Sequence, residues 1–393
     1  MTQKQIDNIA LSLSSLCVFR KILDNPSVSA FYDFVSSHGE LSERLSLYAC
    51  FVATLDGGEK SFSDVICDAM CEDENAYVTK RARGETVSRA LEENVRSELE
   101  ILTSLTRINT ADIRHLLGHA GYLPAFVNET KSLASIYDER VENIGKYGYG
   151  IFASHTMFRV EDGEIVPVTT ADKISTENFV GYESEREQVL ENTKALAEGR
   201  YAANVLLCGD AGTGKSSTVK AAANRFFSEG VRLIELRKDQ LFSLPSVMER
   251  IMHNPLKFII FIDDLSFNKN DDCFSMLKAA LEGSSSAKAQ NAAIYVTSNR
   301  RHIIKETFAD RGDDDIHRAD TVEELMSLSG RFGLVVYFGK PSKQLYLAIV
   351  HGLAERYGIT VPQPELDVRA EAFALAKGSR SPRCAEQFIK SLL

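Results

Sequence analysis

Tryptophan is absent from this 393-residue sequence, proline occurs only nine times, and no apolar run is long enough to cross a membrane. The longest apolar run near the centre, 258–262, is far too short for that role. The amino terminus shows neither the basic head nor the apolar core of a secretory signal. We therefore expect a cytoplasmic protein with no membrane partner.

Cysteine and net positive charge are also scarce. The seven cysteines are scattered and odd in number, which suits reduced thiols better than a disulfide framework. Cys67 and Cys71 lie four residues apart on a predicted helix, but no second pair completes a metal site, so we expect two small core residues. The net charge of −10 argues against a broad, non-specific hold on nucleic acid, although a local basic face would survive that average.

The stretch 205–220, VLLCGDAGTGKSSTVK, carries the strongest functional signal. An apolar strand runs into a turn that reads G-x-x-x-x-G-K-S, and a helix begins near Lys215. Glycines let successive N–H groups point at phosphate oxygens, and the helix N-terminus adds the positive end of its dipole. Lys215 is expected to reach the β- and γ-phosphates, and the Ser216 hydroxyl to bind Mg²⁺. The loop residues expected at the nucleotide are Gly209, Asp210, Ala211, Gly212, Thr213, Gly214, Lys215, Ser216 and Ser217.

A second apolar strand, in KFIIFIDDLSF at 257–267, ends in two carboxylates. Asp263 is placed to hold Mg²⁺ through its water shell, and Asp264 would orient or deprotonate the attacking water. The strand in AAIYVTSN at 292–299 ends in Asn299, whose amide can position that water. A phosphate loop and an acidic strand end, both at strand termini, are together far more specific than either alone. The sequence therefore predicts a nucleoside triphosphate site.

Several arginines extend this predicted site. Arg331 stands just before the last strand, where its guanidinium could project toward the γ-phosphate of a neighbouring subunit. Arg300 and Arg301 follow Asn299 and are alternatives for that role in trans. Arg383 lies in the first turn of the last helix and could reach back to the phosphates, which would couple nucleotide state to lid closure. A surface salt bridge is the alternative interpretation of each arginine.

The spacing of apolar residues divides the chain into four parts. Residues 1–145 have helical spacing and no chemical motif, so we expect a helical domain that binds a partner or substrate. Residues 146–177 form a predicted linker with a β-hairpin at 157–168. An α/β domain at 178–340 and a helical lid at 341–393 follow.

Two details of the helical region are open to test. Asn25-Pro26 is expected to end the first helix, and Ser27 to cap the second. His115 and His119 are four residues apart, but Gly118 breaks the helix between them, so we expect a structural use. A further helix is predicted at 85–106.

The α/β region alternates strands and helices, the pattern of a parallel sheet with helices on both faces. Ser284 to Ser286 and the acidic run 310–320, which includes Asp313, Asp314 and Asp315, are expected in loops, since no calcium-loop spacing is present. The predicted strands are 204–208, 231–236, 257–262, 292–297 and 333–338, and the predicted helices are 214–228, 245–252 and 273–282.

With these pieces in place, the chain from about Asn178 onward resembles the AAA+ ATPases. More closely, VGYESEREQVLENT, FIDDLSF, VTSNRRH, LSGRFG and GSRSPR together are similar to a bacterial AAA+ family of unknown function. The core is also similar to helicase-loader and Holliday-junction-motor ATPases. This resemblance implies a five-stranded parallel sheet in 5-1-4-3-2 order, ATP with Mg²⁺, and a ring or other homo-oligomer. It further implies that the segment FVGYE contacts the adenine, through Val180, Gly181 and Tyr182.

One residue departs from the wider AAA+ pattern. Most members carry glutamate at the second acidic position, where this sequence has Asp264. The shorter side chain reaches less far, so we expect slow hydrolysis rather than none.

Three functions are compatible with these motifs. The first is an ATP-hydrolysing homo-oligomer that remodels or loads an unknown protein or nucleic-acid client held by the N-terminal helices. Phe242, after the second strand, is a weak candidate for a translocating loop. The second is an ATP-controlled conformational switch with little turnover, which Asp264 favours. The third, a small-molecule kinase, lacks a recognisable acceptor-binding segment.

Overall fold

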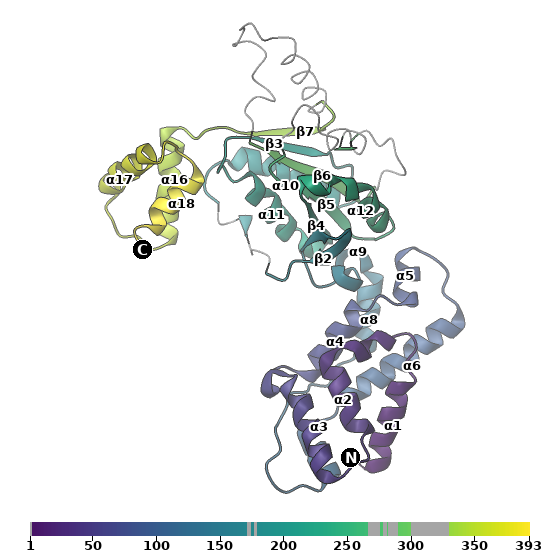
Figure 1. The fold of residues 1–393 in the computed structure, drawn as a ribbon. Coiled ribbons are helices and arrows are strands. Elements are labelled where there is room, and N and C mark those ends of the chain that lie inside the picture. Colours follow the sequence, from purple (N-terminus) through teal and green to yellow (C-terminus); the bar gives the residue numbers. More distant parts are fainter. Residues whose placement is uncertain are drawn as a thin grey trace. The chain divides into compact units, whose positions relative to one another are not determined.

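The computed structural model describes residues 2–170, 174–176, 179–265, 276–277, 281, 290–299 and 330–393. The chain divides into two compact units, Met1–Ser154 and His155–Leu393 (Figure 1). Among the helices in these ranges, none combines the length and the hydropathy that a membrane crossing requires. The expected loops at 284–286 and 310–320, and most of the expected helix at 273–282, lie outside the described residues.

The first unit is helical, as its apolar spacing predicts. Its core contains a cluster of phenylalanine rings, in which Phe51 lies 5.1 Å from Phe31, 4.9 Å from Phe62 and 5.2 Å from Phe126 between ring centroids. Edge-on rings at these distances stabilise a core beyond their buried area. The α-helices are α1 (Gln3–Ser14), α2 (Pro26–Ser36), α3 (Leu41–Ala53), α4 (Phe62–Glu72), α5 (Ala76–Ala82), α6 (Arg89–Leu105), α7 (Thr110–Leu117), α8 (Leu133–Glu142) and α9 (Ile144–Tyr147), with 3₁₀ turns η1 (Arg20–Asp24), η2 (Asp56–Gly58) and η3 (Gly150–Phe152).

The start of this unit differs from the sequence prediction. Helix α1 ends at Ser14 instead of reaching Asn25-Pro26. The buried carboxylate of Glu98 accepts the backbone N–H groups of Cys17 at 2.8 Å and of Phe19 at 2.9 Å. These bonds satisfy donors that a longer helix would have used. Their acceptor lies 81 residues from Cys17 and 79 from Phe19, so the local spacing of apolar residues gives no signal of it.

The cap of α2 also differs from the sequence prediction, which places it at Ser27. The Asn25 side chain accepts the N–H groups of Ser27 at 3.0 Å and Val28 at 3.4 Å, so Asn25 is the cap. Pro26 occupies the first helical position, where a missing N–H costs nothing. Ser27 lies inside the helix and is buried.

The second unit is built on a seven-stranded sheet within the described residues, in the order β2-β1-β4-β5-β6-β3-β7. Its core strands β3, β4, β5, β6 and β7 are parallel, and they have the 5-1-4-3-2 order that the AAA+ resemblance implies. Every residue of β3 is buried, as continuous apolar runs predict for parallel strands covered on both faces. The bounds are β1 (Met157–Glu161), β2 (Glu164–Pro167), β3 (Val205–Gly209), β4 (Val231–Leu236), β5 (Lys257–Ile262), β6 (Ala292–Ser298) and β7 (Leu334–Phe338).

The hairpin β1–β2 belongs to this sheet and does not stand apart as a linker. Strand β1 pairs in parallel with β4, with Phe158 opposite Ile234, and β2 forms the edge. Phe158 is fully buried. The hairpin itself is predictable from Asp162-Gly163, but its pairing with β4 depends on a contact distant in sequence.

Helices α10 (Glu183–Ala197) and α11 (Lys215–Arg225) contact each other, and α11 contacts β4 and β6 (Figure 1). Turn η5 (Phe227–Glu229) follows α11, and η6 (Lys238–Ser243) precedes α12 (Leu244–Ile251). After β7, the lid consists of α16 (Lys343–Arg356), α17 (Gln363–Ala376) and α18 (Pro382–Lys390), which pack on one another.

Candidate nucleotide site

The phosphate loop joins β3 to α11 at the carboxyl end of the sheet. Gly209 has a φ of +135°, and a Cβ there would lie 2.0 Å from the Phe338 carbonyl oxygen. Gly212 has a φ of +76°, and its Cβ position lies 3.1 Å from the Arg383 Cβ in the lid. Glycine is therefore required at both positions by conformation and by space.

Lys215 opens α11 and is buried, with 4% of its surface exposed. Its ammonium donates to the carbonyl oxygens of Gly209 at 3.1 Å and Asp210 at 2.7 Å, and to Asn299 Oδ1 at 2.9 Å. Burial lowers the pKa of Lys215, and the carboxylates of Asp210 and Asp264 oppose that shift. Among the described residues its hydrogen-bond acceptors are all neutral, which leaves the ammonium well suited to an anionic ligand.

The acidic end of β5 lies directly beside the loop. Asp263 Oδ1 accepts hydrogen bonds from Ser216 Oγ at 2.6 Å and from Thr297 Oγ1 at 2.5 Å. The two residues predicted to bind Mg²⁺ are thus in contact. Thr297 was not predicted. It lies on β6 two residues before Asn299, which directly follows the strand, so a strand periodicity of two places both side chains on one face.

Asp264 adopts a left-handed backbone with a φ of +50°, which aspartate tolerates better than most residues. Its N–H donates to Thr297 Oγ1 at 2.8 Å, and its Oδ1 accepts from Asn299 Nδ2 at 2.6 Å. Asn299 therefore links Lys215 to Asp264, with its oxygen toward the cation and its amide N–H toward the carboxylate. That arrangement matches the donor and acceptor capacity of each partner.

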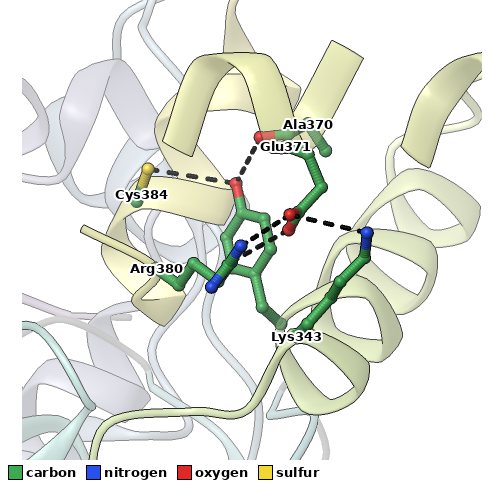
Figure 2. A network of polar contacts seen from close by, with 6 residues as sticks. Lys343, Ala370, Glu371, Arg380 and Cys384 are labelled. Atoms are coloured by element: carbon green, nitrogen blue, oxygen red, sulfur yellow. Dashed lines mark hydrogen bonds and ion pairs between the residues drawn. The ribbon is translucent and has the colours of Figure 1, made fainter. Parts of the chain in front are cut away.

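The lid reaches the loop through the first turn of α18. The backbone N–H of Arg383 donates to the Gly212 carbonyl at 3.2 Å. Figure 2 shows why Arg380, the other arginine of GSRSPR, has a different role: its Nε and a terminal nitrogen donate to Glu371 at 3.0 and 2.7 Å. Lys343 lies 3.7 Å from the same carboxylate. Glu371 thus joins α16, α17 and the turn that leads into α18.

A cavity of about 510 Å³ lies between the loop, the segment before α10, and the lid. Its lining includes residues of the phosphate loop together with apolar side chains from the core and the lid. The lining residues are Ile174, Phe179, Val180, Arg186, Gly212, Thr213, Gly214, Ser217, Ile349, Leu353, Arg356, Tyr357, Pro382, Arg383 and Glu386.

The segment expected at the adenine is only partly at the cavity. Val180 lines it, whereas Gly181 and Tyr182 do not. A Cβ at Gly181 would lie 2.7 Å from Leu345, and Tyr182 donates its hydroxyl to the Gly339 carbonyl at 2.6 Å. These two residues therefore contact the start of the lid.

Other predicted residues are distributed around this centre. Thr213, Gly214 and Ser217 line the cavity, while Ala211 is exposed. Arg331 precedes β7 and is half-buried outside the cavity lining, and Phe242 is exposed in η6. Arg300 and Arg301 lie outside the described residues. Across the ranges that the structure describes, no cluster of three histidine, cysteine or acidic side chains could hold a metal alone.

Residues 153–393 match the model of a protein family described as "Protein of unknown function (DUF815)". The chain belongs to this family. The match covers all of the second unit, and it fits the family of unknown function that the motifs resemble. No curated protein matches the chain.

Solved structures similar to this chain include AMPPCP-bound DnaA from Aquifex aeolicus, with 16% identity, a TM-score of 0.39, and coverage of 57% of this chain and 65% of that one. The replication initiator DnaA bound to AMPPCP and single-stranded DNA is 16% identical, with a TM-score of 0.40 and coverage of 57% of this chain and 66% of that one. The Holliday junction branch migration motor RuvB from Thermotoga maritima is 13% identical, with a TM-score of 0.33 and coverage of 56% of this chain and 72% of that one. The chain thus spans just under two thirds of the length of the DnaA chains. These similarities are remote, and the assignment of the fold depends on the strand order described above.

Proposed function

We propose that the second unit binds ATP with Mg²⁺ and hydrolyses the nucleotide slowly. The observation that carries this proposal is the meeting of Lys215, Ser216, Asp263, Asp264 and Asn299 at the carboxyl ends of three adjacent strands. The carboxyl ends of strands are where open parallel sheets bind ligands. A glycine-rich loop, a buried ammonium and an acidic pair are the groups that triphosphate chemistry needs.

Magnesium fits the side chains that are present. Ser216 and Asp263 offer a hydroxyl and a carboxylate in contact with each other, and Mg²⁺ takes few protein oxygens together with water and phosphate. When bound, the ion neutralises charge on the phosphate oxygens. Thr297 positions Asp263 by a hydrogen bond to the same carboxylate oxygen.

The other side chains of the site have separate roles in the proposed hydrolysis. Asp264 would orient a water molecule and accept its proton as the water oxygen bonds to the γ-phosphorus. The bond from that phosphorus to the bridging oxygen breaks, which yields ADP and phosphate. Lys215 balances charge on the β- and γ-phosphates, and Asn299 positions Asp264 and the water. Arg383 lies close enough to the loop to sense the nucleotide, and Arg331 is proposed to act in trans.

We further propose that turnover drives remodelling or loading of a protein or nucleic-acid client by a homo-oligomer, with the first unit as the client-binding module. The experiment is ATP turnover against protein concentration, with sizing of the same samples with and without ATP. Turnover per subunit that rises with concentration, together with an ATP-dependent larger species, is the expected result. Normal turnover by a monomer would contradict a site shared through Arg331.

One observation favours the second candidate, an ATP-controlled switch. The Asp264 carboxylate is shorter than the usual glutamate and is already bonded to Asn299. A switch would bind ATP tightly with negligible turnover at every concentration and remain a monomer. The same experiment separates the two functions.

A further inference from the structure

Arg186 occupies the first turn of α10 and is buried, with 8% of its surface exposed. Its guanidinium carbon lies 4.4 Å from the centroid of the Phe179 ring, and both residues line the cavity. The spacing of Arg186, Val189, Thr193 and Leu196 places Arg186 on the buried face of α10. An arginine is an unusual residue for such a face.

The guanidinium has an unmet hydrogen-bonding need. Its buried Nε makes no hydrogen bond with the part of the chain that the structure describes. Burial lowers the pKa of Arg186 to about 10, more than the nearby carboxylates of Glu183 and Glu185 raise it. Glu183 instead accepts the Gly181 N–H at 2.7 Å. A buried charge with an unpaired donor is destabilising. The Nε atom is itself covered by protein, but Arg186 lines the cavity, so an acceptor on a ligand could pair with the terminal N–H groups and stabilise the charge from that side.

The rest of the cavity limits what this ligand group is. Its lining combines phosphate-loop residues with the apolar side chains of Val180, Ile349 and Leu353. A flat aromatic base fits such a lining by dispersion and burial. Its edge still carries ring nitrogens that accept hydrogen bonds, and Arg186 supplies donors only.

We propose that Arg186 donates a hydrogen bond to a ring nitrogen of a purine base and so determines the base specificity of the site. This inference rests on the proposed function, because it needs the nucleotide to occupy the cavity. The cation–π contact with Phe179 holds the guanidinium at the cavity, where its N–H groups can meet a ligand. The adenine of ATP carries three ring nitrogens that can accept, at N1, N3 and N7, whereas N1 of guanine is a donor.

The test measures affinity for ATP and for its 1-deaza, 3-deaza and 7-deaza analogues, each of which lacks one acceptor. Wild type should bind one of the three about tenfold more weakly than ATP, and Arg186→Met should bind ATP about ten- to one-hundred-fold more weakly than wild type does. The variant should no longer distinguish that analogue from ATP. Arg225→Met is the matched control, since Arg225 also lies over a phenylalanine but is exposed and outside the cavity lining.

A stability measurement separates this role from a structural one. Methionine fills similar space without a buried charge, so Arg186→Met should not lower the Tm of the ligand-free protein. If that variant does not fold, Arg186→Lys keeps the charge without the planar fork and should still lose the discrimination between analogues.

Three results would overturn the inference. The first is a variant that keeps the wild-type discrimination among analogues, and the second is one whose Tm falls while its ATP affinity is unchanged. The third is an equal loss of affinity for ATP, all analogues and tripolyphosphate, which would assign Arg186 to the phosphates. If wild type itself does not bind ATP, the proposed function fails together with this inference. If wild type binds ATP but Arg186→Met behaves in one of these three ways, only the inference about Arg186 fails.

Discussion

Thr297 offers a sharp test of how the acidic site is held together. Thr297 is buried, with 2% of its surface exposed. Its hydroxyl donates to Asp263 at 2.5 Å and accepts the Asp264 N–H at 2.8 Å. Thr297→Val keeps the shape of the side chain and removes both bonds. The perturbation is therefore nearly free of any packing change.

The magnitude follows from the partners. A hydrogen bond to a charged group contributes about 1.5–3 kcal/mol. The Asp264 N–H retains Asp263 Oδ1 at 3.1 Å, so we add no penalty for an orphaned donor. We expect the free energy of unfolding to fall by about 2 kcal/mol, which for a unit of this size is a Tm loss of about 4–8 °C.

The functional effect should be separable from this loss of stability. Without the threonine hydroxyl, Asp263 is less well oriented toward Mg²⁺, and the loss of such an outer partner weakens metal affinity about ten- to one-hundred-fold. Scanning calorimetry on the full chain gives the Tm of the transition that Mg-ATP shifts, and a Mg²⁺ titration at fixed ATP gives the metal affinity. Thr297→Ser, which keeps the hydroxyl, is the control. If valine and serine at this position behave alike in both assays, the hydroxyl does not hold Asp263.

Three further outcomes are expected. The pKa of Glu371 lies below its ordinary value of 4.5, chiefly because Arg380 bonds the ionised form. The contribution of Glu371 to stability is therefore present above pH 4.5 and is lost as the pH falls through the lowered pKa. Glu371→Gln should reduce the fall of Tm in this acidic range, and an unchanged dependence of Tm on pH would contradict the assignment. Gly212→Ala should introduce about 1–2 kcal/mol of strain, because φ is +76° and the new Cβ would crowd Arg383. The variant should bind ATP more weakly in calorimetry, and an affinity equal to that of wild type would show that this contact with the lid is dispensable. Asn25→Ala should cost about 1 kcal/mol in denaturant unfolding of the first unit through the loss of the α2 cap, with no effect on ATP binding.

Much of the second unit was predictable because its signals are local. Apolar runs such as 257–262 must be buried on both faces, and the phosphate-loop spacing fixes the turn between β3 and α11. The contact between Ser216 and Asp263 follows from the parallel sheet, which brings successive strand ends to one edge.

The features that were missed depend on contacts distant in sequence. Glu98 ends α1 from within α6, the β1 strand joins β4, and Thr297 acts only because β6 pairs with β5. Arg186 was overlooked although the spacing of its helix places it on the buried face. Its significance becomes clear only when the lid and the loop close the cavity around it.

The most direct test of the nucleotide site is calorimetric titration of ATP with Mg²⁺ into wild type, Lys215→Ala and Lys220→Ala. Lys220 lies on the same helix as Lys215 but pairs with Glu235 at 3.0 Å, so it controls for loss of a lysine from α11. The site described here predicts saturable binding by wild type and Lys220→Ala, and its loss in Lys215→Ala. Equal binding by all three proteins, or binding by none, would contradict it.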